Sequence, residues 1–148
     1  MSKQLKLKIV TPEKLILEEE VESVTVPTTE GEITILKDHI PLVAGLASGD
    51  IVARKEGEEI PMALVGGFVE VKNSVDGQTE VAILADFAEH IGEITDEEIA
   101  KAKDKAEELR KKALNKEIVD YEHFEAELEK SLTRVKIADK WKNKKYRK

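Results

Sequence analysis

GEITILKDHIPLVAGLASGD, residues 31–50, is the stretch of this chain that decides its fold. A glycine opens a turn, and the β-branched run at residues 33–36 has the composition of a strand. His39-Ile40-Pro41 then interrupts the chain before a second apolar run and a Ser-Gly-Asp turn. Apolar runs between Gly and Pro punctuation predict short strands joined by tight turns. The stretch contains no metal-ligand or nucleophile spacing, so it predicts scaffold and interface rather than chemistry.

The same pattern of strands and turns continues on both sides of this stretch. Leu5, Leu7 and Ile9 alternate with lysines, a period of two that places the apolar side chains on one face. Asp76-Gly77 predicts a hairpin turn, because both positions tolerate a positive φ. Pro61 predicts that its strand lies at an edge or begins there. The strands are predicted at residues 5–9, 21–27, 33–36, 51–55, 60–65, 68–72 and 80–84.

Glycine and proline divide the chain into two halves. All eight glycines and all four prolines lie at or before Gly92. Because these residues are the strongest punctuation of local structure, we place a boundary near residues 90–95. The prediction is a β domain over residues 1–90 and an α-helical hairpin over residues 91–148. The fold class is therefore α+β, with an antiparallel β-sandwich or barrel followed by two antiparallel helices.

The second half predicts two amphipathic helices joined by a short connection at residues 115–119. Thr95-Asp96-Glu97-Glu98 is a capping box. The Thr95 hydroxyl accepts a hydrogen bond from the backbone N–H of Glu98, and the Glu98 carboxylate accepts one from the backbone N–H of Thr95. Two helices bury little area alone, so the hairpin is predicted to be marginally stable unless it docks on a partner. The predicted apolar stripes are Ile99, Ala102, Ala106, Leu109 and Ala113 in the first helix, and Tyr121, Phe124, Leu128, Leu132, Val135 and Ala138 in the second.

The charge of the chain is unevenly distributed. Its 148 residues carry a net charge of −7, and 37% of them are charged. Residues 130–148 contain nine Lys or Arg and one acid, so this tail is about +8 and the rest of the chain about −15. An acidic body with a basic arm favours an acidic protein surface, a phosphate ligand or an anionic membrane over nucleic acid. No apolar run is long enough to span a bilayer.

No motif for catalysis, phosphate binding or metal binding is present. The sequence lacks GxxxxGK[ST], GxGxxG, GxSxG and HExxH, has no cysteine, and its three histidines are far apart. His39 could be catalytic, but we favour an imidazole that satisfies backbone groups at a turn where Pro41 has no N–H. For Gly66-Gly67 we favour a bulge or close backbone packing beside Phe68 over a ligand approach. We therefore predict neither a catalytic residue nor a bound metal.

Three motifs in a fixed order resemble a known family. The Glu-Gly, strand, His-x-Pro-Leu order of residues 30–42 is followed by GGFVEV at 66–71 and VAILAD at 81–86. Together they resemble the epsilon subunit of bacterial F-type ATP synthase. DYEHFEAELEKSLTRVKIADK, residues 120–140, is similar to the second helix of that family. The resemblance implies a flattened β-sandwich, a helical hairpin, and a non-catalytic rotor subunit of the central stalk that couples proton-driven rotation to ATP synthesis.

The resemblance also implies three contact regions. A turn should face the c-ring, the sandwich should bind the gamma subunit, and basic residues of the second helix should meet an acidic segment of the alpha/beta catalytic head. The hairpin is expected to permit turnover when folded and to block ATP hydrolysis when extended along gamma. The implied residues are Thr28, Thr29, Glu30, Gly31 and Glu32 for the c-ring, His39, Pro41, Gly67 and Phe68 for gamma, and Lys130, Arg134 and Lys136 for the catalytic head.

Two departures from the family pattern bear on its details. Lys37-Asp38 stands where the family has Pro-Gly before the histidine, which changes the chemistry of that turn. Some relatives bind ATP through an Ile/Leu-Asp-x-x-Arg-Ala motif, which corresponds here to Ile94, Thr95, Glu98 and Ile99. A carboxylate repels polyphosphate, and the sequence shows no guanidinium in place of the lost one. We expect no cofactor, and weak or no ATP binding by the isolated subunit.

The implied location is peripheral, on the cytoplasmic face of a bacterial cell membrane, where partner subunits hold the chain. The N-terminus lacks the leader expected of a mitochondrial counterpart. One alternative is a β-domain adaptor whose basic amphipathic tail, including Trp141, binds an anionic membrane surface or an acidic partner. Another is a hydrolase with an unrecognised site, for which no motif argues.

Overall fold

The computed structural model describes residues 3–115 and 121–146, with side chains described as far as Lys142. The chain splits into two compact units, Met1–His90 and Ile91–Lys148. The first unit consists of strands and the second of helices. The predicted helix connection, from residue 116 onward, and the end of the basic tail lie outside the described residues.

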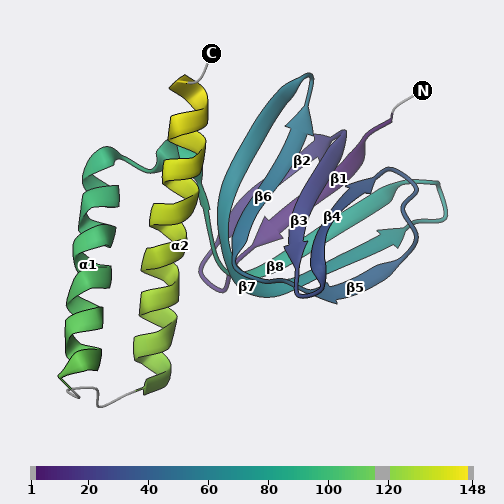
Figure 1. The fold of residues 1–148 in the computed structure, drawn as a ribbon. Coiled ribbons are helices and arrows are strands. Elements are labelled where there is room, and N and C mark those ends of the chain that lie inside the picture. The colour runs from purple at the N-terminus through teal and green to yellow at the C-terminus, as the bar shows by residue number, and fades with distance from the viewer. Residues whose placement is uncertain (1–2, 116–120, 147–148) are drawn as a thin grey trace. The chain divides into compact units, whose positions relative to one another are not determined.

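The first unit is a β-sandwich (Figure 1), as predicted. Its hydrogen-bonded strand order is β2-β1-β8-β7-β6-β3-β4, and β5 pairs with β7. The pairing is antiparallel except between β1 and β8, which run parallel. The strands are β1 (Leu5–Val10), β2 (Leu15–Val21), β3 (Ser23–Thr28), β4 (Gly31–Leu36), β5 (Leu42–Gly45), β6 (Gly49–Lys55), β7 (Glu58–Asn73) and β8 (Thr79–His90).

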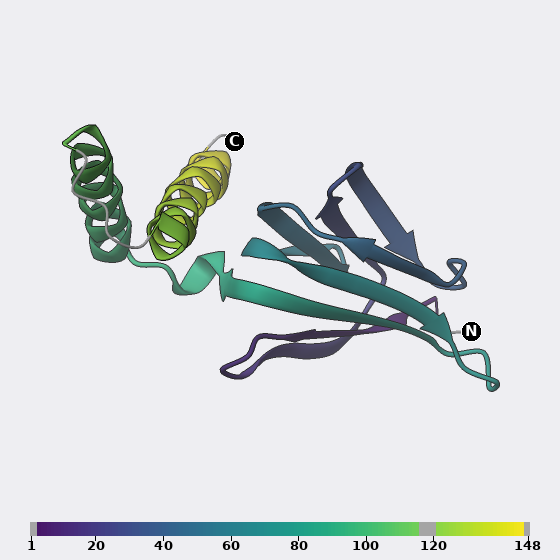
Figure 2. The same cartoon turned by 90° about the horizontal axis from the view of Figure 1, so that it is seen from below.

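Alternating apolar residues fill the space between two layers of strands. Leu5, Leu7 and Ile9 of β1 are buried, as their period of two predicts. Val24 and Val26 of β3 face the same core from the other layer. Figure 2 shows β1 and β2 on one side of the sandwich and β3 and β4 on the other. Burial of these side chains supplies the main stabilising term of the unit.

Strand β7 belongs to both layers because its neighbour changes halfway along. Residues 58–64 pair with β6, whereas residues 68–71 pair with β5. The inward-facing residues are even-numbered up to Leu64 and odd-numbered from Val69 onward. The strand therefore reverses its alternation where it passes from one layer to the other.

Gly66 and Gly67 make this reversal possible. Their φ angles are +60° and +116°, in the region that favours glycine. A Cβ on Gly67 would lie 2.0 Å from the carbonyl oxygen of Leu84 in β8. The pairing register of β7 with β8 is the same on both sides of the glycines. Of the two predicted explanations, close backbone packing is thus confirmed and a bulge is wrong.

The structure corrects several strand predictions. Strand β2 was not predicted, because three consecutive glutamates, residues 18–20, disfavour a strand. At the end of the sheet order their side chains remain in contact with water, which protects an exposed edge. The predicted strands 60–65 and 68–72 are one strand, β7, and Pro61 lies just beyond its pairing with β8. The strand predicted from residue 21 begins at Ser23.

The second unit is a helical hairpin preceded by a short 3-10 turn, η1 (Ile91–Glu93). Helices α1 (Asp96–Leu114) and α2 (Tyr121–Tyr146) lie side by side and antiparallel (Figures 1 and 2). The α1 stripe is buried as predicted except for Ala113, which is exposed in the last turn. The α2 stripe is partly wrong, since Tyr121 and Leu132 are exposed. The buried residues of α2, among the side chains that are described, are Ser131, Thr133, Ile137 and Ala138.

Candidate functional site: an apolar row on the sandwich and a charge-paired hairpin

A row of apolar side chains, exposed except for the half-buried Val10, crosses the outer face of the sandwich. Pairing registers place Leu15 opposite Val10, Val10 opposite Leu84, and Leu84 opposite Phe68. Val43 of β5 lies diagonally beside Phe68 on the same face. Phe68 is 59% exposed and Leu84 54% exposed. We call these five residues the outer apolar row.

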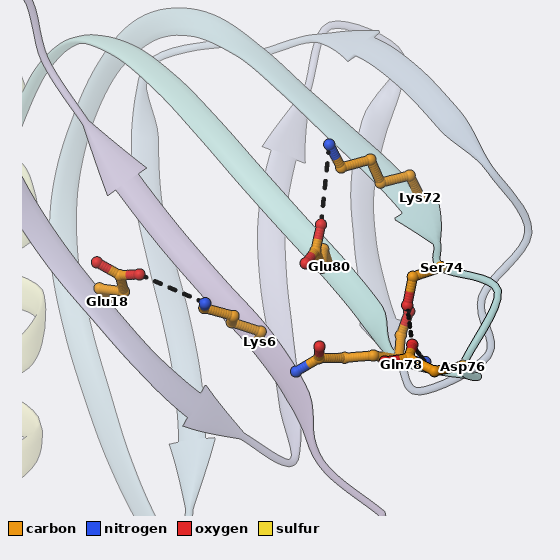
Figure 3. Close-up of polar contacts among 7 residues, drawn as sticks. All are labelled: Lys6, Glu18, Lys72, Ser74, Asp76, Gln78 and Glu80. Atoms are coloured by element: carbon orange, nitrogen blue, oxygen red, sulfur yellow. Dashed lines mark hydrogen bonds and ion pairs between the residues drawn. The ribbon is translucent and has the colours of Figure 1, made fainter.

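A charged border runs along one side of the outer apolar row. Lys6 lies opposite Glu80 and pairs with Glu18 at 3.6 Å, and Lys72 pairs with Glu80 at 3.8 Å. Figure 3 shows both pairs on neighbouring strands. The charges alternate in sign, so the border is polar but close to neutral. This face of the sheet therefore offers an apolar strip with a defined polar edge, which is the composition of a protein interface.

The turn between β7 and β8 carries a tightly bonded aspartate. The Ser74 hydroxyl donates to Asp76 Oδ1, and the Gln78 N–H donates to the same oxygen at 3.2 Å (Figure 3). These hydrogen bonds, the Ser74 bond foremost, lower the pKa of Asp76 below its usual 3.8. Gly77 has a φ of +86°, so the predicted hairpin turn is confirmed.

A polar network fixes the loop before β5. The buried Thr79 hydroxyl accepts the Asp38 N–H at 2.7 Å and donates to Asn73 Oδ1 at 2.7 Å. The Asn73 side-chain amide in turn donates to the His39 carbonyl at 2.9 Å. Asp38 has a φ of +67°, a conformation that glycine adopts more readily and that aspartate tolerates. Lys37-Asp38 stands where the resembled family has Pro-Gly, and Asp38 takes the left-handed conformation that a glycine would adopt more readily.

The predicted gamma-facing residues are only partly brought together. His39 Nδ1 donates to the Ile40 carbonyl at 2.7 Å, so the predicted role of this imidazole at the turn is confirmed. Pro41 and Val43 line a shallow depression next to β7. Phe68 lies on the outer face, whereas Gly67 contributes only its close approach to β8. His39 lies at the other end of this sheet edge, beside Asn73.

The turn predicted to face the c-ring is a compact hairpin tip. Thr28 accepts the Glu30 N–H at 3.3 Å and donates to the Gly31 carbonyl, while the Thr29 N–H donates to Gly45 of β5 at 3.0 Å. Gly31 has a φ of +125°. Glu30 and Glu32 project from this tip as exposed carboxylates. The backbone of the turn is therefore fixed while its side chains remain available.

The capping box at the start of α1 is confirmed. The Glu98 N–H donates to Thr95 Oγ1 at 3.1 Å, and the Thr95 N–H donates to Glu98 Oε2 at 3.0 Å. Ile94 and Ile99, the other two positions that correspond to the ATP motif, are buried. All four positions are thus engaged in capping or packing.

The basic residues predicted to reach the catalytic head differ in their surroundings. Lys130 and Lys136 are exposed, whereas the side chain of Arg134 is 21% exposed and lies 3.9 Å from Glu98. The sequence alone shows no guanidinium in place of the arginine lost from the ATP motif, but the folded hairpin brings one close to Glu98. The guanidinium comes from α2, and its charge is balanced by Glu98 itself.

Within residues 3–115 and 121–146, no group of three His, Cys, Asp or Glu side chains is arranged to hold a metal ion. Neither described helix is long and apolar enough to cross a membrane. The surfaces that remain are the outer apolar row, the exposed turn and the basic helix, all of which suit contacts with other proteins.

The sandwich defines the class of protein. Residues 4–91 match the family model described as ATP synthase, Delta/Epsilon chain, beta-sandwich domain. The match covers the whole of the described sandwich, including the strands that carry the outer apolar row.

Relatives that are similar over nearly the full length place the chain within this class. An ATP synthase epsilon chain of Desulforamulus reducens is 39% identical over 139 residues, which cover 94% of this chain and 100% of the relative. That of Nitratidesulfovibrio vulgaris is 38% identical over 137 residues, which cover 93% of this chain and 97% of the relative. The chain belongs to the ATP synthase epsilon chain family, as its motifs indicated, and is thus an accessory chain rather than a catalytic one.

A solved structure supports the fold across both units. A chain in the cryo-EM structure of Euglena gracilis mitochondrial ATP synthase, OSCP/F1/c-ring, aligns with a TM-score of 0.63 at 26% identity. The alignment covers 99% of this chain and 84% of that one.

Sequence reasoning missed most of the outer apolar row. Phe68 was identified through its motif, but Val10, Leu15, Val43 and Leu84 were not. Each is an apolar residue at an outward position of its strand, and that signal is visible in the alternation. What the sequence does not show is the register that aligns these residues across strands.

Proposed function

We propose that this chain is a non-catalytic central-stalk subunit that couples proton-driven rotation of a c-ring to ATP synthesis and restrains ATP hydrolysis through its helical hairpin. Family membership supports the first part of the proposal. The partners are the gamma subunit, the c-ring and the catalytic head of alpha and beta subunits. The location is the cytoplasmic face of a bacterial membrane, where the chain is held through these partners.

The outer apolar row is the observation that carries the proposal. Exposed apolar side chains scattered singly need no explanation, but a row that runs across five neighbouring strands does. Phe68 is its aromatic member and lies near the centre, which is where binding energy concentrates in protein interfaces. The row is fixed by sheet pairing before any partner arrives, so binding requires little ordering. We assign this face to gamma.

Binding of the full-length chain to purified gamma tests this assignment. Phe68→Ser and Leu84→Ser should each weaken binding by about tenfold or more, because each removes an apolar anchor. Both side chains are more than half exposed, so the free energy of unfolding should change by less than about 0.5 kcal/mol. Titration calorimetry measures the affinity, and urea denaturation measures the stability.

Leu36→Ser is the matched control. Leu36 is 57% exposed but lies on β4, away from the row. It should bind gamma as the wild type does. If Phe68→Ser, Leu84→Ser and Leu36→Ser all bind gamma with equal affinity, the outer apolar row is not the gamma-binding face. Binding of the wild type alone to anionic vesicles at physiological salt would favour the membrane-adaptor alternative instead.

The exposed turn and the hairpin complete the proposal. The tip at residues 28–32 presents Glu30 and Glu32 on a fixed backbone, which suits a polar contact with the loops of a rotating ring. Lys130, Arg134 and Lys136 lie on one helix and are proposed to meet an acidic segment of the catalytic head. Such charge pairing sets orientation and salt sensitivity more than raw affinity.

A further inference from the structure

Four ion pairs join α1 to α2 among the described residues. They differ from the pairs between neighbouring turns of one helix, such as Lys101–Glu97 and Lys112–Glu108, because they break if the helices separate. The four pairs are Asp96–Lys142 at 2.7 Å, Lys105–Glu127 at 3.7 Å, Lys103–Asp139 at 3.9 Å and Glu98–Arg134 at 3.9 Å.

Of the four basic side chains in these pairs, Arg134 is the least exposed to solvent. The side chain of Arg134 is 21% exposed, compared with 33% for Lys142 and 57% for Lys103. Glu98 is also held in place, since one of its oxygens accepts the Thr95 N–H in the capping box. The carboxylate is thus oriented by α1 before Arg134 of α2 approaches it.

We infer that Glu98 competes inside the folded hairpin with the acidic segment of the catalytic head for Arg134. This inference rests on the proposed function, which assigns Arg134 to that segment. In the folded hairpin Glu98 masks Arg134, while Lys130 and Lys136 stay exposed. When the helices separate, Arg134 exchanges an internal carboxylate for an external one.

Because of this exchange, the equilibrium between the folded and the extended hairpin depends on the charge of Glu98. Because a carboxylate neutralises Arg134 in both states, the two states differ little in electrostatic free energy, as a reversible switch requires. Removing the charge of Glu98 penalises only the folded state. A partly exposed ion pair of this kind should shift the ratio of extended to folded hairpins about two- to fivefold.

Glu98→Gln removes the charge and keeps the helix start. Glutamine is the other residue that completes a capping box, so the bond to the Thr95 N–H persists. Glu97→Gln is the matched control, because it removes the same charge one residue away. The described ion pair of Glu97 is with Lys101 in the same helix and does not join the two helices.

Distance measurements on the full-length chain provide the first readout. The chain contains no cysteine, so Ala100→Cys and Ala126→Cys, one on each helix, allow specific spin labelling. Pulsed electron resonance should show a larger extended fraction for Glu98→Gln and no change for Glu97→Gln. In the assembled ATP synthase, Glu98→Gln should also deepen the inhibition of ATP hydrolysis.

The inference is overturned if Glu98→Gln leaves the distance distribution unchanged, if Glu97→Gln shifts it equally, or if inhibition does not deepen. A chain ending at His90 separates this failure from that of the proposed function. If removal of the hairpin leaves hydrolysis unchanged, the proposed inhibitory function is wrong. If removal raises hydrolysis while Glu98→Gln has no effect, only the competition for Arg134 is wrong.

Discussion

Gly67 is the residue at which the two layers of the sandwich become continuous. It combines a φ of +116° with a backbone distance to β8 that leaves no room for a side chain. Phe68 follows directly and is displayed on the outer face. The presentation of the proposed gamma contact therefore depends on a neighbour that contacts no partner itself.

Gly67→Ala should lower the free energy of unfolding of the sandwich by roughly 2–3 kcal/mol, because backbone strain and a steric clash add. Gly57→Ala is the control, since Gly57 has a φ of +80° but nothing within 4 Å of a Cβ. Strain alone should cost that variant about 1 kcal/mol. Urea denaturation distinguishes the two, and equal losses would show that the clash with Leu84 is unimportant.

For single residues, the sequence predicts the hydrogen-bonding role of a side chain better than the backbone conformation that the residue adopts. His39 was correctly interpreted as a turn residue from the missing N–H of Pro41 alone. The left-handed conformation of Asp38 was not predictable, because the Thr79 hydroxyl that holds it lies 41 residues away. A contact across that separation is a property of the folded sheet.

The helical hairpin is stabilised by a few buried apolar residues and by ion pairs between exposed or partly exposed side chains. Asp96, in the first turn of α1, accepts a hydrogen bond from Lys142 of α2 at 2.7 Å. This bond and the ammonium charge lower the pKa of Asp96 below its usual 3.8. Asp96 is 94% exposed, so the pair is screened and its contribution is small.

The lowered pKa of Asp96 predicts how the hairpin responds to acid. A carboxyl with a depressed pKa contributes stability that is fully present above its unfolded value, 3.8, and is lost as the pH falls through the folded value. Asp96→Asn should therefore lower hairpin stability near pH 6, where the carboxylate is charged, and the difference should disappear once the pH has fallen below the folded pKa. Helix ellipticity during thermal unfolding measures this. A difference that persists in acid would contradict the assigned pair.

Local signals explain which elements were predictable. The capping box and the alanine stripe of α1 act within a few residues, so the sequence alone predicts that helix well. Strand β2 was missed because its glutamates are tolerated only at a sheet edge. The α2 stripe was partly wrong because small residues such as Ser131 and Ala138 are buried while the larger Leu132 is exposed.

At the scale of the whole molecule, the chain combines a fixed platform with a separately folded pair of helices. The sandwich carries the outer apolar row on strands, whereas the hairpin is held by caps, a narrow stripe and ion pairs. The family was recognisable because short motifs occur in a fixed order. The pairing of Glu98 with Arg134, which bears on regulation, depends on how two helices align and was not predictable.

The rate of ATP hydrolysis by the assembled enzyme, with the full chain or with a chain ending at His90, shows whether the hairpin restrains hydrolysis while the sandwich alone supports assembly. The cut follows β8, because His90 pairs with Met62 and Ala88 lies in the core. We expect the shortened chain to assemble with gamma and the rate of hydrolysis to rise, since the platform remains and the inhibitor is removed. An unchanged rate with the shortened chain in place would show that the hairpin does not inhibit hydrolysis.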